Sequence, residues 1–261
     1  MLCLSRIPEK VTVEEHLAKA RAVASLIDQT LLKPEATEQD IFRLCADALE
    51  YKFAAICVNP CWVTAARERL ADSPVRICTV VGFPLGANES QVKIKEAVLA
   101  LTQGAHEIDM VQNIGALRSG HFAVVRQEIA ALADLAHFHG ARLKVILETC
   151  LLSDEQKKIA SRLAGEAKAD FVKTSTGFST GGATEADVRL MREVVGAALG
   201  VKASGGIRSL DALRGMVQAG ANRIGTSSGP QILRELAGEA NAPSAAPVAA
   251  GKVPGGQSDA Y

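Results

Sequence analysis

The fold of this chain is decided by three short apolar runs that each carry one lysine, Arg142-Leu-Lys-Val-Ile-Leu147, Phe171-Val-Lys-Thr-Ser175 and Gly200-Val-Lys-Ala-Ser204. The lysines are Lys144, Lys173 and Lys202, and neighbours in this series are 29 residues apart. That spacing is about one strand-plus-helix unit of an eightfold barrel of roughly 250 residues. We therefore expect the three lysines on three adjacent parallel strands, at similar height.

Five further runs complete a set of eight. In chain order, the runs are 25–29, 53–58, 76–83, 107–111, 142–148, 171–175, 200–204 and 222–226. Nearly all are apolar throughout rather than alternating, which is typical of parallel strands covered by helices on both faces. The sequence thus predicts a parallel sheet of eight strands.

Helical stretches separate the runs, and several have recognisable ends. Hydroxyl caps with acidic first turns begin at Thr37, Ser153 and Thr184, while glycines that end helices stand at positions 104, 140 and 220. Eight such units predict the α/β class and a closed (β/α)8 TIM barrel. An open doubly wound sheet is the alternative, but six strands would suffice there and no strand-linked GxGxxG occurs.

The barrel is expected to span residues 25–238, with an extension at each end. In residues 1–24, an amphipathic helix over 11–24 is expected either to plug the barrel bottom or to bind a partner subunit. Residues 239–261 are rich in Ala, Pro and Gly, which predicts a flexible tail that ends in Tyr261.

Composition narrows the class of protein. The 261 residues carry a net charge of +0 without runs of like charge, which argues against nucleic-acid and membrane partners. No apolar stretch approaches the roughly 18 residues of a membrane span. The six cysteines form no CxxC pair, which favours reduced thiols and a cytoplasmic protein.

The three lysines predict nucleophilic chemistry. Lysine is rarely buried unless it is paired or functional, and a rim salt bridge is the ordinary alternative for each one taken alone. Two ammonium groups ~6 Å apart repel by roughly 3 kcal/mol at an effective dielectric near 20, which is about two pKa units. Lys173 is flanked by the other two. We therefore expect it to be a neutral amine near pH 7 that forms a Schiff base with an aldehyde or ketone.

Acidic residues within the apolar runs are candidates for proton transfer. Asp109 is expected to face Lys202 through water and to relay protons during imine chemistry. Asp28 and Glu148 are expected to be further inward-facing acids. We favour a role for them in balancing the charge of the lysines over the alternative, direct participation in the chemistry.

Glycine-rich loops follow the seventh and eighth runs, where such barrels commonly bind phosphate. The candidate phosphate-binding residues are Gly177, Gly205, Gly206, Gly225, Ser227 and Ser228. The expected substrate is therefore a small phosphorylated sugar.

The sequence contains no strong motif for a metal site or for an organic cofactor. The five histidines have no HxxxH spacing, and no G-x-S-x-G elbow occurs. We expect no metal and no organic cofactor, although a pyridoxal phosphate bound to the lysine is an alternative. Cys57 is either exposed to the pocket or, as we favour, a buried structural cysteine.

Taken together, several segments resemble the deoxyribose-phosphate aldolase family. The segments are Leu26-Ile-Asp-Gln-Thr-Leu-Leu32, Ile56-Cys-Val-Asn-Pro60, Glu107-Ile-Asp-Met-Val-Gln-Asn-Ile-Gly115, Asp170-Phe-Val-Lys-Thr-Ser-Thr-Gly177 and Val201-Lys-Ala-Ser-Gly-Gly-Ile-Arg208. The resemblance implies reversible cleavage of 2-deoxy-D-ribose 5-phosphate to D-glyceraldehyde 3-phosphate and acetaldehyde, without a cofactor.

The resemblance also implies residue roles. Lys173 is similar to the Schiff-base lysine, Asp109 and Lys202 to the proton-transfer pair, and Tyr261 to a C-terminal tyrosine that assists enamine protonation. Phe178 is a departure, because some relatives have a basic residue there. The phosphate contact at that position therefore stays open, and a weaker preference for the 5-phosphate is an alternative.

Other functions remain as alternatives at this point. A transaldolase-like or other phosphosugar aldolase would share Lys173, and a phosphosugar-binding barrel without catalysis would share the loops. A homodimer is the candidate assembly.

Overall fold

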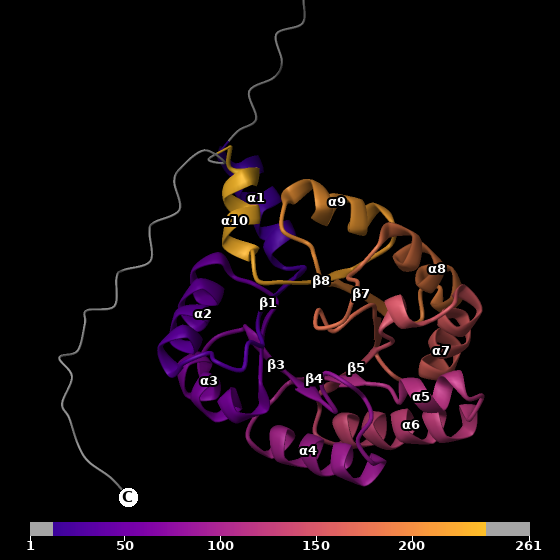
Figure 1. The fold of residues 1–261 in the computed structure, drawn as a ribbon. Coiled ribbons are helices and arrows are strands. Elements are labelled where there is room, and N and C mark those ends of the chain that lie inside the picture. The colour runs from indigo at the N-terminus through magenta and orange to yellow at the C-terminus, as the bar shows by residue number, and fades with distance from the viewer. Residues whose placement is uncertain (1–12, 239–261) are drawn as a thin grey trace, which may run out of the picture.

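The computed structural model describes residues 13–238, which form a closed barrel of eight parallel strands surrounded by helices (Figure 1). The strands are β1 (Ile27–Leu31), β2 (Ala55–Val58), β3 (Arg76–Val81), β4 (Glu107–Val111), β5 (Arg142–Ile146), β6 (Phe171–Lys173), β7 (Gly200–Ser204) and β8 (Arg223–Thr226). Each strand pairs with the next, and β8 closes the ring on β1. The predicted TIM barrel is confirmed, and the open sheet is excluded.

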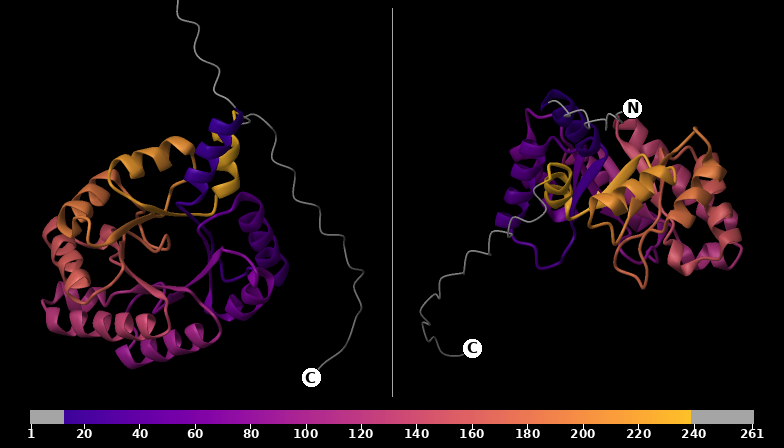
Figure 2. Two further views of the ribbon diagram at one scale, coloured as in Figure 1. Left: turned by 180° about the vertical axis from the view of Figure 1, so that it is seen from behind. Right: turned by 90° about the horizontal axis from the view of Figure 1, so that it is seen from above.

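Helices form the outer ring and follow the strands in turn (Figure 2). They are α1 (Val13–Ala24), α2 (Glu38–Tyr51), α3 (Val63–Leu70), α4 (Ser90–Thr102), α5 (Ile114–Arg118), α6 (Phe122–Phe138), α7 (Asp154–Glu166), α8 (Glu185–Val195), α9 (Leu210–Gln218) and α10 (Gly229–Leu236), with short 3-10 turns η1 (Pro60–Trp62) and η2 (Thr149–Leu151). The expected capping boxes begin α2 and α7. None of the helices within residues 13–238 is long and apolar enough to cross a membrane.

Helix α1 packs beside α10 at the edge of the barrel and does not cover its centre (Figure 1). Of the two roles expected for this helix, closure of the barrel bottom is therefore wrong, while binding of a partner subunit stays a prediction. The tail over 239–261, with Tyr261, lies outside the described residues.

Several strand ends differ from expectation, and β6 also ends at Lys173 rather than at Ser175. The third and fifth runs were expected to reach Phe83 and Glu148, but β3 ends at Val81 and β5 at Ile146. Gly82 has a φ of +63° and Glu148 a φ of +57°, and a left-handed residue cannot continue an extended strand. Strand β1 lies two residues later in the chain than the predicted run.

The barrel interior is divided into an apolar part and a charged part. A small cluster from β2 and β3, which includes Ala55, Cys57, Cys78 and Val80, fills one side. Strands β4 to β8 contribute six buried charged residues to the interior, which are Glu107, Asp109, Lys144, Lys173, Lys202 and Arg223. The larger apolar core lies between the strands and the helices. The candidate reacting groups therefore lie in the charged half of the interior.

Candidate active site

Asp109 on β4 is the centre of the charged half. Its Oδ1 accepts a hydrogen bond from Lys144 Nζ at 2.7 Å, and its Oδ2 accepts from Lys173 Nζ at 2.7 Å and Lys202 Nζ at 2.8 Å. Strand alternation explains the placement, because neighbours such as Ile108 point outward into the core between strands and helices. The structure thus brings together all three predicted lysines and the predicted acid. The expected water between Asp109 and Lys202 is wrong, because the contact is direct.

The three lysines do not share one height. Lys173 is the register partner of Lys202 on β7, whereas its partner on β5 is Ile146. Lys144 is paired instead with Asp109, and it lies two residues before Ile146. The expectation of equal height therefore holds for Lys173 and Lys202 and is wrong for Lys144. Equal spacing along the chain does not reveal the stagger between the tilted strands of a closed barrel.

A deeper layer of charges lies beneath Asp109. Glu107 Oε2 is 2.6 Å from Lys144 Nζ, and Arg223 Nη1 is 2.7 Å from Asp28 Oδ1 and 3.1 Å from Glu107 Oε2. Asp28 Oδ2 also accepts a short hydrogen bond from Lys202. The prediction that Asp28 balances lysine charge is confirmed in its geometry.

Sequence reasoning did not single out Glu107 and Arg223 as members of the site. The sequence did contain a sign of their orientation, namely the alternation of side chains along a strand. Glu107 stands two residues before Asp109, and Arg223 two before Gly225, so each shares the inward face of its strand.

Mutual attraction keeps these groups ionised. Burial would raise the pKa of Asp109, but Lys144, Lys173 and Lys202 hold that pKa well below its ordinary value. Burial would lower the pKa of Lys202, but Asp109 and Asp28 raise it above its ordinary value, and carboxylates act likewise on the pKa of Lys144. The repulsion expected between the lysines is therefore offset for Lys144 and Lys202, because carboxylates are interleaved with the ammonium groups.

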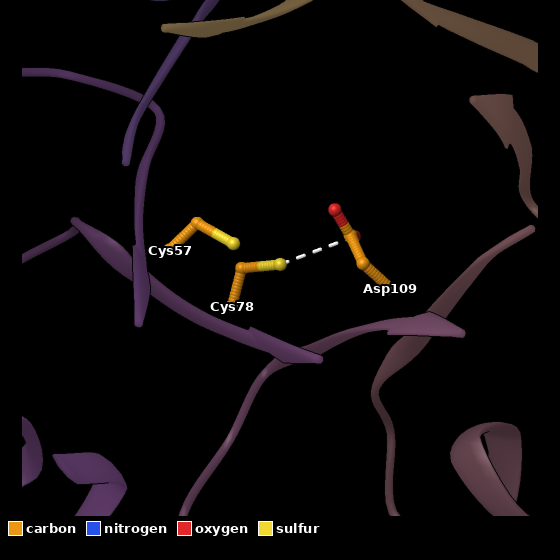
Figure 3. Close-up of side chains that lie close together, drawn as sticks. All are labelled: Cys57, Cys78 and Asp109. Atoms are coloured by element: carbon orange, nitrogen blue, oxygen red, sulfur yellow. Dashed lines mark hydrogen bonds between the residues drawn. The ribbon is translucent and has the colours of Figure 1, made fainter. Parts of the chain in front are cut away.

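Two cysteines lie beside this cluster (Figure 3). Cys57 and Cys78 come from neighbouring strands and point toward Asp109, and Cys78 Sγ donates to Asp109 Oδ1 at 3.1 Å. Cys57 is fully buried, as favoured from the sequence, whereas Cys78 was not singled out. Burial raises the pKa of the Cys78 thiol.

The same three residues have metal-ligating atoms within 4.8 Å of one another, as do Asp28, Cys78 and Glu107. The carboxylates in both groups already accept hydrogen bonds from ammonium or guanidinium groups. A metal ion would therefore have to displace those ion pairs.

A cavity of about 400 Å³ opens above the cluster at the carboxyl ends of the strands. Of the three lysines, Lys173 is among its lining residues, whereas Lys144 and Lys202 lie beneath and are at most 1% exposed. The wall includes the predicted phosphate-binding residues Gly177, Gly205, Gly206, Gly225 and Ser227.

Ser228 is the exception among the predicted phosphate-binding residues. It is not a lining residue, and its backbone N–H already donates to Thr226 Oγ1 at 2.9 Å. Sequence reasoning did not single out Lys33 and Arg208, two cations on the cavity wall. Both are in loops, where a lysine or arginine is ordinarily a solvated surface residue.

Glycine is required by the local structure at several positions of the wall, for example at Gly206 and Gly225. Gly206 has a φ of +82°, which favours glycine. At Gly225, an added Cβ would lie 2.3 Å from Ser204 Oγ and 3.1 Å from Lys202 Cε. Gly225 is therefore required for the close packing around Lys202, whatever it contributes to phosphate binding.

Glu148 is not part of the lysine cluster. Its carboxylate accepts hydrogen bonds from the backbone N–H of Thr176 at 3.2 Å and from the Thr176 hydroxyl. The expectation that Glu148 balances the lysines is wrong, because the left-handed backbone at this residue turns its side chain toward the loop after β6. That loop carries Gly177 and Phe178, so Glu148 anchors one wall of the cavity.

Comparison with known proteins gives one consistent result. Residues 22–236 match the model of the DeoC/LacD family of aldolases. The deoxyribose-phosphate aldolase of Caldanaerobacter subterraneus subsp. tengcongensis is 56% identical over 214 residues, which are 82% of this chain and 93% of that protein.

Solved structures give the same picture. A putative deoxyribose-phosphate aldolase from Coccidioides immitis superposes with a TM-score of 0.80 and 41% identity, covering 83% of this chain and 86% of that one. The deoxyribose phosphate aldolase from Aeropyrum pernix, described as tetrameric, has a TM-score of 0.78 and 35% identity and covers 87% of this chain and 98% of that one.

Proposed function

The chain belongs to the DeoC/LacD family of aldolases, and we propose that it is a deoxyribose-phosphate aldolase that works through a Schiff base on Lys173. The reaction is the reversible cleavage of 2-deoxy-D-ribose 5-phosphate to D-glyceraldehyde 3-phosphate and acetaldehyde. Lys173 would be the nucleophile, and Asp109 and Lys202 the groups that move protons.

The assignment rests on one observation: Lys173 lies between the charged cluster around Asp109 and the cavity above it. Its side chain lines the cavity, while its nitrogen donates to Asp109. Within residues 13–238, Asp109 is its one carboxylate partner, whereas Lys202 contacts Asp28 and Asp109, and Lys144 contacts Asp28, Glu107 and Asp109. A neutral amine at Lys173 therefore costs the fewest ion pairs.

In the cleavage direction, the neutral amine attacks C1 of the open-chain sugar, and loss of water from the carbinolamine gives an iminium ion. A base takes the proton of the C3 hydroxyl, and the C2–C3 bond breaks. Its electrons move to the iminium, so an enamine remains as glyceraldehyde 3-phosphate leaves. Protonation at C2 and hydrolysis then release acetaldehyde and restore the amine.

Protons for these steps are available next to Lys173. Asp109 Oδ2 accepts from both Lys173 and Lys202, so a proton can pass between the two amines across one carboxylate oxygen. The raised pKa of Lys202 keeps this group protonated, so that it carries a proton, and the lowered pKa of Asp109 keeps that carboxylate ionised as an acceptor.

Reductive trapping tests the assignment. Borohydride with acetaldehyde should leave an ethyl group on Lys173, located by mass spectrometry of a digest, and the Lys173→Ala variant should show none. A trapped adduct on another lysine would overturn the role of Lys173. Absence of a two-carbon adduct anywhere, together with trapping of a ketose such as dihydroxyacetone, would favour the transaldolase-like alternative.

We further propose a homo-oligomer that works in the cytoplasm, with the homodimer as the first assembly to test. The described cysteines are all free thiols, which supports a reducing compartment. The tetramer described for the Aeropyrum pernix relative is the competing assembly. Sedimentation velocity of the full chain distinguishes the two by mass.

A further inference from the structure

The charged cluster inside the barrel contains more cations than carboxylates. Within residues 13–238 its members are Asp28, Glu107, Asp109, Lys144, Lys173, Lys202 and Arg223, and none of them is more than 7% exposed. When all are ionised, the three carboxylates and four cations leave a surplus of one positive charge. An unbalanced charge in a buried site is costly, and a buried ionisable group relieves that cost by becoming neutral. Release of one proton therefore brings the cluster into balance.

Lys173 is the group best placed to release that proton. An arginine side chain keeps its proton in proteins, so Arg223 is a fixed cation. Carboxylates raise the pKa of Lys144 and of Lys202 above the ordinary value, which holds these two ammonium groups in the charged form. Among the described residues, Lys173 has Asp109 as its one carboxylate partner. A neutral Lys173 therefore leaves three cations against three carboxylates.

Arg223 is held beneath Lys173 by contacts with three other strands. Its Nη1 donates to Asp28 Oδ1 on β1 at 2.7 Å and to Glu107 Oε2 on β4 at 3.1 Å. Its guanidinium carbon lies 5.4 Å from the ring centroid of Phe171, which precedes Lys173 by two residues on β6. Two residues of a strand span about 6.6 Å, so the charge of Arg223 acts on Lys173 across about one layer of side chains.

Two thiols face the cluster from the apolar side of the interior (Figure 3). Cys78 lies beside Asp109, and burial raises the pKa of the Cys78 thiol, which keeps it uncharged at neutral pH. The hydrogen bond with Cys78 lowers the pKa of Cys57 from its ordinary value. Both thiols are the same in every variant compared below, so they do not contribute to differences between variants.

Further cations lie at the margins of the cluster, where water reaches them. Arg76 Nε is 4.0 Å from Glu107 Oε1, and 42% of the Arg76 side chain is exposed. Above Lys173, the exposed residues Lys33 and Arg208 line the cavity, and neither has a described carboxylate oxygen within 4.0 Å. Solvent screens exposed charges of this kind, whereas the buried charge of Arg223 is screened much less.

We propose that Arg223 is a positioning residue of the reaction, whose fixed positive charge beneath the site keeps Lys173 in the neutral form that attacks the substrate carbonyl. The proposal rests on the proposed function, because Lys173 is the nucleophile of that function. Without the charge of Arg223, three lysines would face three carboxylates, and that set is balanced while Lys173 still carries its proton. Loss of the charge of Glu107 has the opposite effect, because the surplus of positive charge then increases.

The experiment follows the acidic limb of the pH profile of kcat/KM for 2-deoxy-D-ribose 5-phosphate, because this limb reports an ionisation of the free enzyme. Full-length wild type is compared with Arg223→Gln, Arg223→Lys, Glu107→Gln and the double variant Arg223→Gln/Glu107→Gln. Arg76→Met is the matched control, since Arg76 approaches the same Glu107 carboxylate with a side chain that is exposed to water.

We expect the midpoint of the acidic limb to rise by about one to two pH units in Arg223→Gln, because the loss of a cation about 7 Å away favours the protonated amine. Glu107→Gln should lower the midpoint, and the double variant should return it to the wild-type value. Arg223→Lys keeps the charge and should keep the midpoint even if the rate falls. Arg76→Met should show no shift.

An unchanged midpoint in Arg223→Gln would overturn the proposal. Shifts of the same sign in Arg223→Gln and Glu107→Gln would also overturn it, because they indicate a disturbed structure rather than an effect of charge. If Arg223→Gln does not fold, the double variant is compared with Glu107→Gln instead. A higher midpoint in the double variant then supports the role of Arg223, and equal midpoints reject it.

Failure of the proposed function has a different signature. Wild type would then not cleave the sugar and would give no borohydride adduct on Lys173. Competitive labelling with acetic anhydride, measured on Lys173 by mass spectrometry as a function of pH, detects the free amine even in that case. A labelling midpoint that is higher in Arg223→Gln than in wild type supports the charge balance, and equal midpoints reject it.

Discussion

Lys173 and Lys202 are register partners on neighbouring strands, and both donate to one oxygen, Asp109 Oδ2. Like charges directly opposite each other on paired strands are destabilising, so the shared carboxylate is what permits this arrangement. Lys202 has Asp28 as a second acid, and Lys173 faces the cavity instead. The difference supports the proposed division of tasks, in which Lys202 is the proton donor and Lys173 the nucleophile.

Replacement of Lys202 by Met should harm both stability and catalysis. The change leaves Asp28 and Asp109 buried with one cation fewer, and breaking a buried ion pair costs about 3–5 kcal/mol. Loss of the proton donor should lower kcat/KM by about 100-fold or more. Urea unfolding and aldolase assays check the two effects, with Lys95→Met as the surface control. A free energy of unfolding within about 1 kcal/mol of wild type would contradict this account.

Acid should weaken the fold through Asp28. Burial opposes ionisation of this group, but Lys202, Lys144 and Arg223 hold its pKa below the ordinary value. Its contribution is therefore present above the unfolded pKa of about 3.9 and is lost as pH falls toward the folded pKa. Asp28→Asn should be less stable than wild type at pH 7. The difference should shrink by about 1.4 kcal/mol per unit below about pH 4 in urea titrations; a difference that stays constant down to about pH 2.5 would count against this linkage.

Gly225→Ala should disturb the site, although Gly225 is not itself one of the reacting groups. The new methyl group would be forced against Ser204 and Lys202, and overpacking of this kind typically costs about 1–3 kcal/mol. Displacement of Lys202 should also slow formation of the trapped adduct. Gly140→Ala is the control, because Gly140 has a φ of +69° but no atom within 4 Å of the added Cβ. Equal effects of the two substitutions on trapping would rule out the packing explanation.

A second buried ion pair supports the end of β4. Lys93 Nζ donates to Glu128 Oε2 at 2.9 Å and to the Val111 carbonyl at 2.9 Å, and the Lys93 side chain is 0% exposed. Lys93→Met should lower the free energy of unfolding by about 3–5 kcal/mol, because Glu128 is left buried and unpaired. The double variant Lys93→Met/Glu128→Leu should recover part of the loss in urea unfolding. A double variant less stable than the single one would show that the ion pair is not the cause.

The fold was largely predictable because its signals are local. Apolar runs at one-unit spacing, hydroxyl caps such as Thr37 and helix-ending glycines such as Gly140 are each visible within a few residues. The apolar runs around Lys173 and Asp109 also predicted that both residues face the interior. The structure agrees, because their neighbours Val172 and Ile108 lie in the core between strands and helices.

The site was predictable only in part, because contacts between strands depend on their stagger. Nothing local showed that Lys144 lies deeper than Lys173 or that Glu107 meets Arg223. Glu148 was misplaced because one left-handed residue reverses the direction of a side chain. Lys33 is an ordinary loop lysine in the sequence, and its place on the cavity wall follows from the closure of β8 on β1.

By itself, the sequence determined the barrel and the inward lysines and predicted the kind of chemistry they would support, since periodicity and residue type are properties of short segments. Only the tertiary structure decided which carboxylate each ammonium meets, which lysine reaches the cavity and which cations remain unpaired at its wall. Those outcomes depend on distances of a few ångströms between residues far apart in the chain, and strand tilt and ring closure set those distances.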